Sequence, residues 1–144
     1  MFHIVLYEPE IPPNTGNIMR LCANSGCKLH LVHPLGFEID DKRMRRAGLD
    51  YIDKTLMQEY PDYAACLKNF SANRLFACST KGTTHYTEIN YQAGDVFIFG
   101  PETRGLPDEV LNTFSDKHIL RVPMLEGSRS MNLSNTVVSQ EKRP

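Results

Sequence analysis

The chain has 144 residues, a formal net charge of −1 and 41% hydrophobic residues. This length suits one domain with one core, and the near-neutral charge excludes the overall basic character of many nucleic-acid-binding proteins, so any RNA binding must use a local patch. No apolar run approaches the roughly 20 residues that span a bilayer, and the N-terminus shows no signal peptide. We therefore expect one domain over residues 1–144, cytoplasmic and not at a membrane.

The first predicted elements are a strand, a helix and a second strand. Residues 2–7 are apolar and partly β-branched, which predicts a buried strand. Three prolines follow, and Asn14 or Thr15 is expected to cap a helix that runs through Asn24 and stops at Gly26. Residues 29–32 predict the second strand, and residues 42–47 a short helix.

The same alternation continues to the end of the chain. Pro61 is expected to open a helix over residues 62–70, which residues 75–78 and 96–99 follow as the third and fourth strands. A short helix over 107–111 and a fifth strand over 118–122 complete the pattern. This order predicts an α/β fold with a mainly parallel sheet flanked by helices.

Three successive strand ends lead into loops rich in Gly, Pro and Ser, at residues 79–82, 100–107 and 123–135. Ligands of open α/β sheets gather beyond the carboxyl ends of the strands, although such loops can also be simple turns. The segment SRSMNLSN, residues 128–135, fits either a cap for a final helix or a loop that grips a ligand. Neither a G-x-G-x-x-G fingerprint nor a P-loop is present, which disfavours a Rossmann dehydrogenase or an NTPase.

Four residues superficially resemble a zinc set, namely Cys22, Cys27, His30 and His33. The two histidines are expected on a strand, where their odd spacing points them to opposite faces, and structural zinc sites usually show tight paired spacings. We therefore expect no metal, and we expect the four cysteines of the chain to be reduced and partly buried.

Two groups of basic residues are candidates for phosphate contact. Arg20 lies on the first predicted helix, and Lys42, Arg43, Arg45 and Arg46 follow closely on the next. Either group could simply be a solvated surface with local ion pairs. The functional alternative is RNA binding, because arginine can bind phosphate in bidentate form.

Together three motifs resemble those of a known family. N-T-G-N-I-M-R (14–20), F-G-P-E-T-R-G-L-P (99–107) and R-S-M-N-L-S-N (129–135) are similar to the motifs of the SpoU-type RNA ribose methyltransferases in the SPOUT superfamily. Within that family, L-Y-E-P-E-I-P-P-N-T-G-N-I-M-R-L-C-A-N and P-L-G-F-x-x-D-D-K-R-x-R-R-x-G-L-D-Y resemble the TrmL (YibK-like) tRNA methyltransferases. The resemblance runs from about residue 1 to residue 138 in the same order.

The resemblance implies a SPOUT fold with a C-terminal trefoil knot, acting as a homodimer. It implies that S-adenosylmethionine donates a methyl group to the ribose 2′-hydroxyl of the wobble nucleotide, a cytidine or carboxymethylaminomethyluridine, in the anticodon loop of leucine tRNAs. The cofactor would be held mainly by backbone groups of the knot loops. Carried onto this chain, those groups belong to Cys78, Gly100, Glu102, Val122, Met124, Ser130 and Met131.

The resemblance also implies roles around the acceptor ribose. A guanidinium hardly loses its proton, so we expect Arg20 to fix the adjacent phosphate and to stabilise developing oxyanion charge rather than to act as a base. Asn14 and Asn132 would orient the site. The residues expected to hold tRNA phosphates are Lys42, Arg43, Arg45, Arg46 and Arg104.

The expected final helix is short in this sequence. After Thr136-Val137-Val138 the apolar stripe gives way to S-Q-E-K-R-P, whereas relatives continue with a long amphipathic helix that forms much of the dimer interface. The expectation is therefore a truncated last helix and a weakened homodimer. Two alternatives stay open: a truncated remnant that binds RNA without methyl transfer, and a SPOUT enzyme that acts on another RNA, such as ribosomal RNA.

Overall fold

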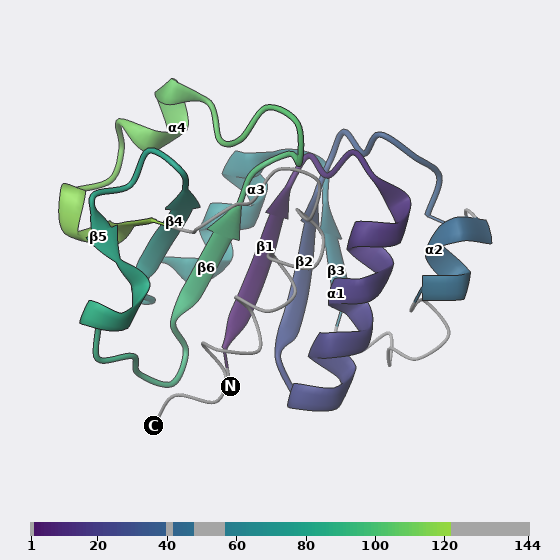
Figure 1. The fold of residues 1–144 in the computed structure, drawn as a ribbon, viewed down its shortest axis with the longest axis horizontal. Helices are drawn as coiled ribbons and strands as arrows, with labels where there is room; N and C mark the ends of the chain where they lie inside the picture. The colour runs from purple at the N-terminus through teal and green to yellow at the C-terminus, as the bar shows by residue number, and fades with distance from the viewer. Residues whose placement is uncertain (1, 40–41, 48–56, 122–144) are drawn as a thin grey trace.

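A computed structural model describes residues 2–39, 42–47 and 57–121 (Figure 1). Within these residues seven strands form one sheet in the order β3-β2-β1-β6-β4-β7-β5, and every strand pair is parallel. The strands are β1 (His3–Tyr7), β2 (Lys28–Val32), β3 (Met57–Tyr60), β4 (Leu75–Ser79), β5 (Thr84–His85), β6 (Val96–Phe99) and β7 (Ile119–Arg121). The predicted α/β class with a mainly parallel sheet is confirmed. The predicted knot and last helix lie outside the described residues.

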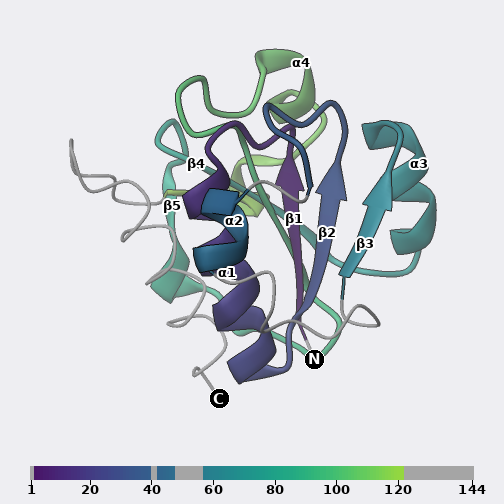
Figure 2. The ribbon, with the colours of Figure 1, turned by 90° about the vertical axis from the view of Figure 1, so that its right-hand side faces the viewer.

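Helices cover both faces of the sheet. Figure 2 shows α1 on one face, with α2 outside it, and α3 on the other face. The α-helices are α1 (Pro12–Ser25), α2 (Lys42–Ala47), α3 (Tyr63–Leu67) and α4 (Asp108–Leu111), and three short 3-10 helices are η3 (Lys68–Phe70), η4 (Tyr86–Glu88) and η5 (Asp116–His118). No helix in the described ranges is long and apolar enough to cross a bilayer.

The period-two alternation of the strands divides the core into two layers. In β1, Ile4 and Leu6 pack in the layer that contains Ile18 and Met19 of α1. Val5 points the other way, into the layer that contains residues of α3 and α4. Because a parallel sheet is covered on both faces, its central strands must be apolar in both directions, and β6 is buried along its whole length.

The start of α1 differs from the sequence-based prediction. Ile11, not Asn14 or Thr15, is the N-cap residue, and Pro12 and Pro13 occupy the first helical positions. Proline is favoured there because its missing N–H is one that a helix start leaves unpaired anyway. Asn14 and Thr15 are consequently helical and buried. The predicted stop is confirmed, since Gly26 adopts φ +81° and donates its N–H to the Cys22 carbonyl.

Two strands escape prediction from the sequence. β3 reads M-Q-E-Y and exposes Gln58 and Glu59, which suits the edge of a sheet but resembles a loop in composition. β5 has only two residues. The helix predicted over 62–70 divides into α3 and η3, with the Asp62 carboxylate capping α3 by accepting the Ala65 N–H at 2.8 Å.

A buried polar network joins the first three strands. His30 is 2% exposed, and its Nδ1 lies 2.8 Å from the Tyr60 hydroxyl while its Nε2 lies 3.0 Å from Nδ1 of His3. Asn69 donates from Nδ2 to the same hydroxyl at 2.6 Å. The ring of Phe70 packs edge-on against both imidazoles. Burial lowers the pKa of His30 from 6.5 to about 3, so His30 is neutral at pH 7.

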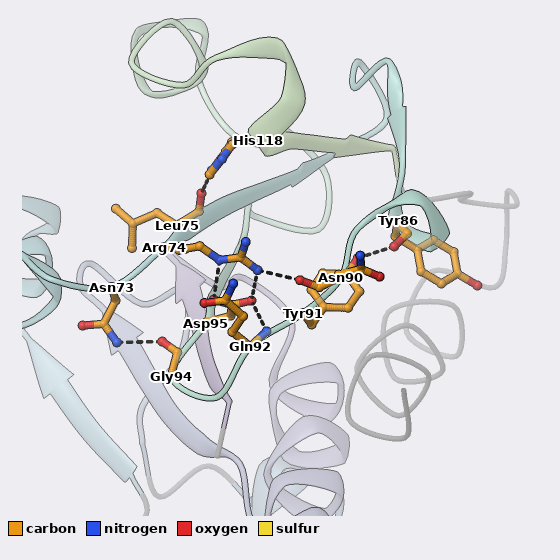
Figure 3. A network of polar contacts seen from close by, with 10 residues as sticks. All are labelled: Asn73, Arg74, Leu75, Tyr86, Asn90, Tyr91, Gln92, Gly94, Asp95 and His118. Atoms are coloured by element: carbon orange, nitrogen blue, oxygen red, sulfur yellow. Dashed lines mark hydrogen bonds and ion pairs between the residues drawn. The ribbon is translucent and has the colours of Figure 1, made fainter. Parts of the chain in front are cut away.

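A second network ties the beginnings of β4 and β6 together (Figure 3). The Asp95 carboxylate is 2% exposed and accepts from Nε and Nη2 of Arg74 at 2.9 and 2.6 Å and from the Gln92 N–H at 2.8 Å. Arg74 also donates to the Asn90 carbonyl at 2.9 Å. A buried carboxylate needs such compensation, because desolvation of an unpaired charge costs several kcal/mol.

The His30 network predicts acid sensitivity. The unfolded chain takes up this proton near pH 6.5 and the folded chain only near pH 3, so protonation favours unfolding; the stability is complete above pH 6.5 and falls as the pH decreases towards 3. Between pH 6.5 and 5 the free energy of unfolding should fall by about 1–2 kcal/mol from His30 alone. Urea unfolding of wild type and His30→Asn would measure the slope, which should be shallower in the variant. The same slope in both proteins would contradict the prediction, and exposed His85→Asn serves as the control.

Candidate active site

The carboxyl ends of the central strands meet at one edge of the sheet. The register places Phe99 of β6 beside both Leu6 of β1 and Cys78 of β4, and Tyr7 beside Val32 of β2. The loops that follow these strands, residues 8–11, 33–39, 80–83 and 100–107, therefore begin side by side. In Figure 1 they line the upper edge of the sheet. This edge is where ligands of open α/β sheets bind.

Glu102 connects the loop after β6 to the start of α1. Its Oε2 accepts the backbone N–H of Glu10 at 2.7 Å and that of Ile11 at 2.9 Å. In a capping box, a glutamate of the helix itself accepts the N–H of the N-cap residue. Here the N-cap residue is Ile11, whose side chain makes no cap hydrogen bond, and the glutamate comes from a distant loop.

The electrostatics of Glu102 reflect its partly buried position. Burial raises the pKa of the Glu102 carboxyl, and the hydrogen bonds from backbone N–H groups, including those of Glu10 and Ile11, act in the opposite direction. A negative charge at the start of α1 also interacts favourably with the helix dipole. The carboxylate thus stabilises the helix start and fixes the loop from which it comes.

Glu10 makes the reverse connection. Its Oε1 accepts the Thr103 backbone N–H at 3.0 Å and the Thr103 hydroxyl at 2.6 Å, and its Oε2 lies 3.3 Å from Nε of Arg104. Arg104 also lies 3.5 Å from a carboxylate oxygen of Glu8. The hydrogen bonds from Thr103 lower the pKa of Glu10, with a smaller contribution from Arg104.

Two glycines permit the close approach of these loops. A Cβ on Gly100 would lie 2.3 Å from the Leu106 backbone nitrogen, and a Cβ on Gly36 would lie 2.9 Å from Cα of Glu10. Gly36 donates its N–H to the Pro9 carbonyl at 2.9 Å. The loop after β1 is therefore held between the loops after β2 and β6.

The described members of the predicted site lie on this edge or on the helix that begins there. Cys78 is buried at the end of β4, while Gly100 and Glu102 follow β6, the neighbouring strand. Asn14 is buried in the first turn of α1, and Arg20 is exposed further along the same helix. Five predicted residues lie outside the described part of the chain: Val122, Met124, Ser130, Met131 and Asn132.

The predicted phosphate-binding residues divide between two places. Lys42, Arg43 and Arg46 are exposed on α2, which packs on α1, the helix that carries Arg20 (Figure 2). Arg45 is also in α2, but its side chain lies outside the description. Arg104 is about half exposed and carries ion pairs with Glu8 and Glu10, so its charge is shared with the loop after β1.

The four residues weighed as a zinc set do not assemble. Cys22 and Cys27 lie in the core layer beneath α1, whereas His30 bonds to Tyr60 and packs against Phe70. His33 pairs with Glu59 at 2.8 Å. In the described ranges no group of three or more histidine, cysteine or acidic side chains could hold a metal ion. All four cysteines are buried.

The contact between Glu10 and Thr103 was not predicted from the sequence. Their contact joins residues 93 positions apart, so no local pattern reveals it. The only signal was indirect: an acidic residue in the loop after one strand, and Thr and Arg in the loop after another. Register between β1 and β6 is what brings them together.

A cavity of about 430 Å³ lies at the opposite edge of the sheet, where β4 and β7 begin. Among its lining residues, Asn73 donates to the Gly94 carbonyl, His118 bonds through Nδ1 to the Leu75 carbonyl, and Arg74 is paired with Asp95 (Figure 3). These polar groups are engaged within the protein, and none of the lining residues belongs to the three motifs, so the carboxyl edge is the stronger candidate for an active site.

Comparison with known proteins assigns the family. The model of the SpoU rRNA methylase family matches residues 1–138, and the chain belongs to that family. A tRNA (cytidine(34)-2′-O)-methyltransferase of Escherichia coli (strain K12) is 56% identical over 137 residues, which cover 95% of this chain and 87% of that protein.

Solved structures agree with the fold. One, described as giving structural insights into the 2-OH methylation of C/U34 on tRNA, matches with a TM-score of 0.83 and 37% identity, over 98% of this chain and 95% of that one. A SpoU methyltransferase from Streptomyces viridochromogenes, AviRb, determined in complex with the cofactor AdoMet, matches with a TM-score of 0.73 over 99% of this chain and 58% of that one. At 16% identity the second match supports the fold alone.

The geometry around Gly100 predicts that the site tolerates no side chain there. Gly100→Ala would force the backbone at 105–106 to shift, because backbone atoms cannot rotate away as a side chain can. Overpacking of this kind costs about 1–3 kcal/mol, and urea unfolding would measure it. Gly26→Ala is the comparison, since a Cβ there meets no atom within 4 Å and costs only the strain of a positive φ, about 1–2 kcal/mol. An unchanged free energy of unfolding in Gly100→Ala would contradict the prediction.

Proposed function

We propose that this chain transfers a methyl group from S-adenosylmethionine to the ribose 2′-hydroxyl of the wobble nucleotide, a cytidine or carboxymethylaminomethyluridine, in leucine tRNAs. The observation that carries the proposal is the 56% identity, over almost the whole chain, to a tRNA (cytidine(34)-2′-O)-methyltransferase. The proposal includes a cytoplasmic location, a homodimer and recognition of the anticodon loop.

The described residues fit the proposed methyl donor. Cys78 lies at the end of β4, and Gly100 and Glu102 follow the neighbouring strand β6, in a turn so tight that Gly100 has no room for a Cβ. Such a turn offers backbone groups rather than side chains to a ligand, which suits recognition of an adenine edge. Val122, Met124, Ser130 and Met131 would complete the site. Bound there, S-adenosylmethionine would supply a methyl group on a sulfonium that carries its own leaving group.

The chain's own task is then to position the acceptor. The ribose 2′-oxygen forms the new C–O bond as the C–S bond breaks; the sulfur keeps the electron pair, and the hydroxyl proton leaves to water. Arg20 keeps its own proton, so we assign it to the neighbouring phosphate and to the charge that develops on the 2′-oxygen. Asn14 and Asn132 orient the ribose. Lys42, Arg43, Arg45, Arg46 and Arg104 bind tRNA phosphates.

The direct test uses this chain, labelled S-adenosylmethionine and unmodified leucine tRNAs, with the methylated nucleotide located by nuclease digestion and mass spectrometry. We expect a 2′-O-methyl group at position 34. Label on a base or on another ribose would overturn the assignment. In the same assay Arg20→Lys should lower kcat about 10- to 100-fold, because an ammonium cannot reproduce the bidentate guanidinium. Full turnover by Arg20→Lys would refute that role.

Binding of tRNA should depend on salt through α2. Each lost phosphate contact should reduce the slope of log K against log salt by about 0.7–0.9. The double variant Lys42→Gln/Arg46→Gln should therefore flatten the slope by about 1.4–1.8, as measured by filter binding at several KCl concentrations. The matched control is Lys68→Gln/Lys117→Gln, which removes the same charge from exposed positions in η3 and η5. Equal slopes for the two double variants would show that α2 does not bind phosphate.

A further inference from the structure

We propose that Glu10 is a positioning residue which, together with Glu102, locks the methyl-donor loop to the helix that carries Arg20. We name these reciprocal contacts, between Glu10 and Thr103–Arg104 and between Glu102 and Glu10–Ile11, the glutamate clasp. The proposal rests on the proposed methyl transfer and adds to it a residue that the three motifs do not contain.

The contacts of the clasp run in both directions between the two loops. Glu102 accepts two backbone N–H groups of the loop after β1, and Glu10 accepts one backbone N–H and one hydroxyl of the loop after β6. Each loop therefore supplies an acceptor for the backbone of the other. Backbone N–H groups fix the position of the chain itself, so a shift of either loop would break bonds at both glutamates.

The two loops lead directly to the two halves of the proposed reaction. The loop over residues 8–11 ends at Pro12, where α1 begins, and α1 carries Asn14 and Arg20. The loop over residues 100–107 contains Gly100 and Glu102, which we assign to the methyl donor. Alignment of a nucleophile with its target is sensitive to shifts of about 1 Å. The clasp therefore sets the distance on which that alignment depends.

The chemistry at position 10 calls for a carboxylate. Three donors point at it: the N–H and hydroxyl of Thr103 and Nε of Arg104. A carboxylate is an acceptor only, whereas the amide of glutamine would turn an NH₂ group towards one of these donors. The lowered pKa of Glu10 keeps it ionised at neutral pH.

The loop after β2 packs against the loop over residues 8–11 and so supports the clasp. Gly36 approaches Cα of Glu10 so closely that a Cβ would lie 2.9 Å away, and its N–H bonds to the Pro9 carbonyl. Glu8 is held at φ +47°, donates its N–H to the Val32 carbonyl at 3.0 Å and pairs with Arg104. Residues 8–11 are thus fixed on both sides, and the clasp joins an already supported segment to the donor loop.

The kinetic test compares Glu10→Ala, Thr103→Val and the double variant with wild type. We expect kcat for methyl transfer to fall about 10- to 100-fold in Glu10→Ala, with dissociation constants for S-adenosylhomocysteine and for tRNA within about threefold of wild type. The kcat of Glu10→Gln should lie between those of wild type and Glu10→Ala. The double variant should be no slower than Glu10→Ala, because Glu10→Ala already removes the carboxylate that the Thr103 hydroxyl contacts. Exposed Glu88→Gln is the control for loss of a negative charge.

A second readout separates the clasp from the proposed function. Amide hydrogen exchange should quicken at Thr103 in Glu10→Ala, and also at Ile11, whose acceptor is Glu102 and not the mutated residue. If the contact were only local, amide exchange would quicken at Thr103 alone. Wild-type kcat in Glu10→Ala, or unchanged protection of Ile11, would overturn the clasp. An inactive wild-type chain would instead overturn the proposed function, and the exchange at Ile11 would still decide the clasp.

Discussion

The position of β6 between β1 and β4 is the constraint on which the rest of this structure depends. β1 and β2 follow one another in the chain and pair directly, but β6 arrives some 90 residues later and separates β1 from β4. Because all three central strands are parallel, this insertion places the loop after β6 beside the loop after β1. Without it, Glu10 and Glu102 would have no means of meeting.

The topology also determines how the N-terminus of α1 is stabilised. Two prolines remove the first two helical N–H donors, and a carboxylate from another loop accepts the N–H of Ile11. In a capping box, a side chain of the helix itself accepts this N–H. Here the acceptor is available only when the loop after β6 is in place. The fold thereby couples the order of a local element to a tertiary contact that the proposed reaction also needs.

Much of the fold could be predicted from the sequence, because buried parallel strands are apolar runs bounded by turn residues; β1, β2, β4, β6 and β7 were found this way. β3 was missed since an edge strand exposes polar side chains, and β5 since two residues leave no pattern. Gly100 and Glu102 were proposed for the site from the second motif, and Cys78 from the family resemblance. The contact between Glu10 and Thr103 could not be predicted from the sequence, because it arises only from strand register. The helix start was misplaced because Asn14 is a good cap by type, whereas the prolines before it already suit the first turn.

The buried thiols have a consequence for the chemistry of the intact protein. Cys22, Cys27 and Cys66 are fully buried and Cys78 is 6% exposed, and burial raises the pKa of Cys66 to about 12. A thiol in such a setting is neither a nucleophile nor accessible to an alkylating reagent. Such a thiol can therefore be labelled only after the core layer around it opens. The cysteines sit on both sides of the sheet, so their separate labelling rates would report how each half of the core loosens.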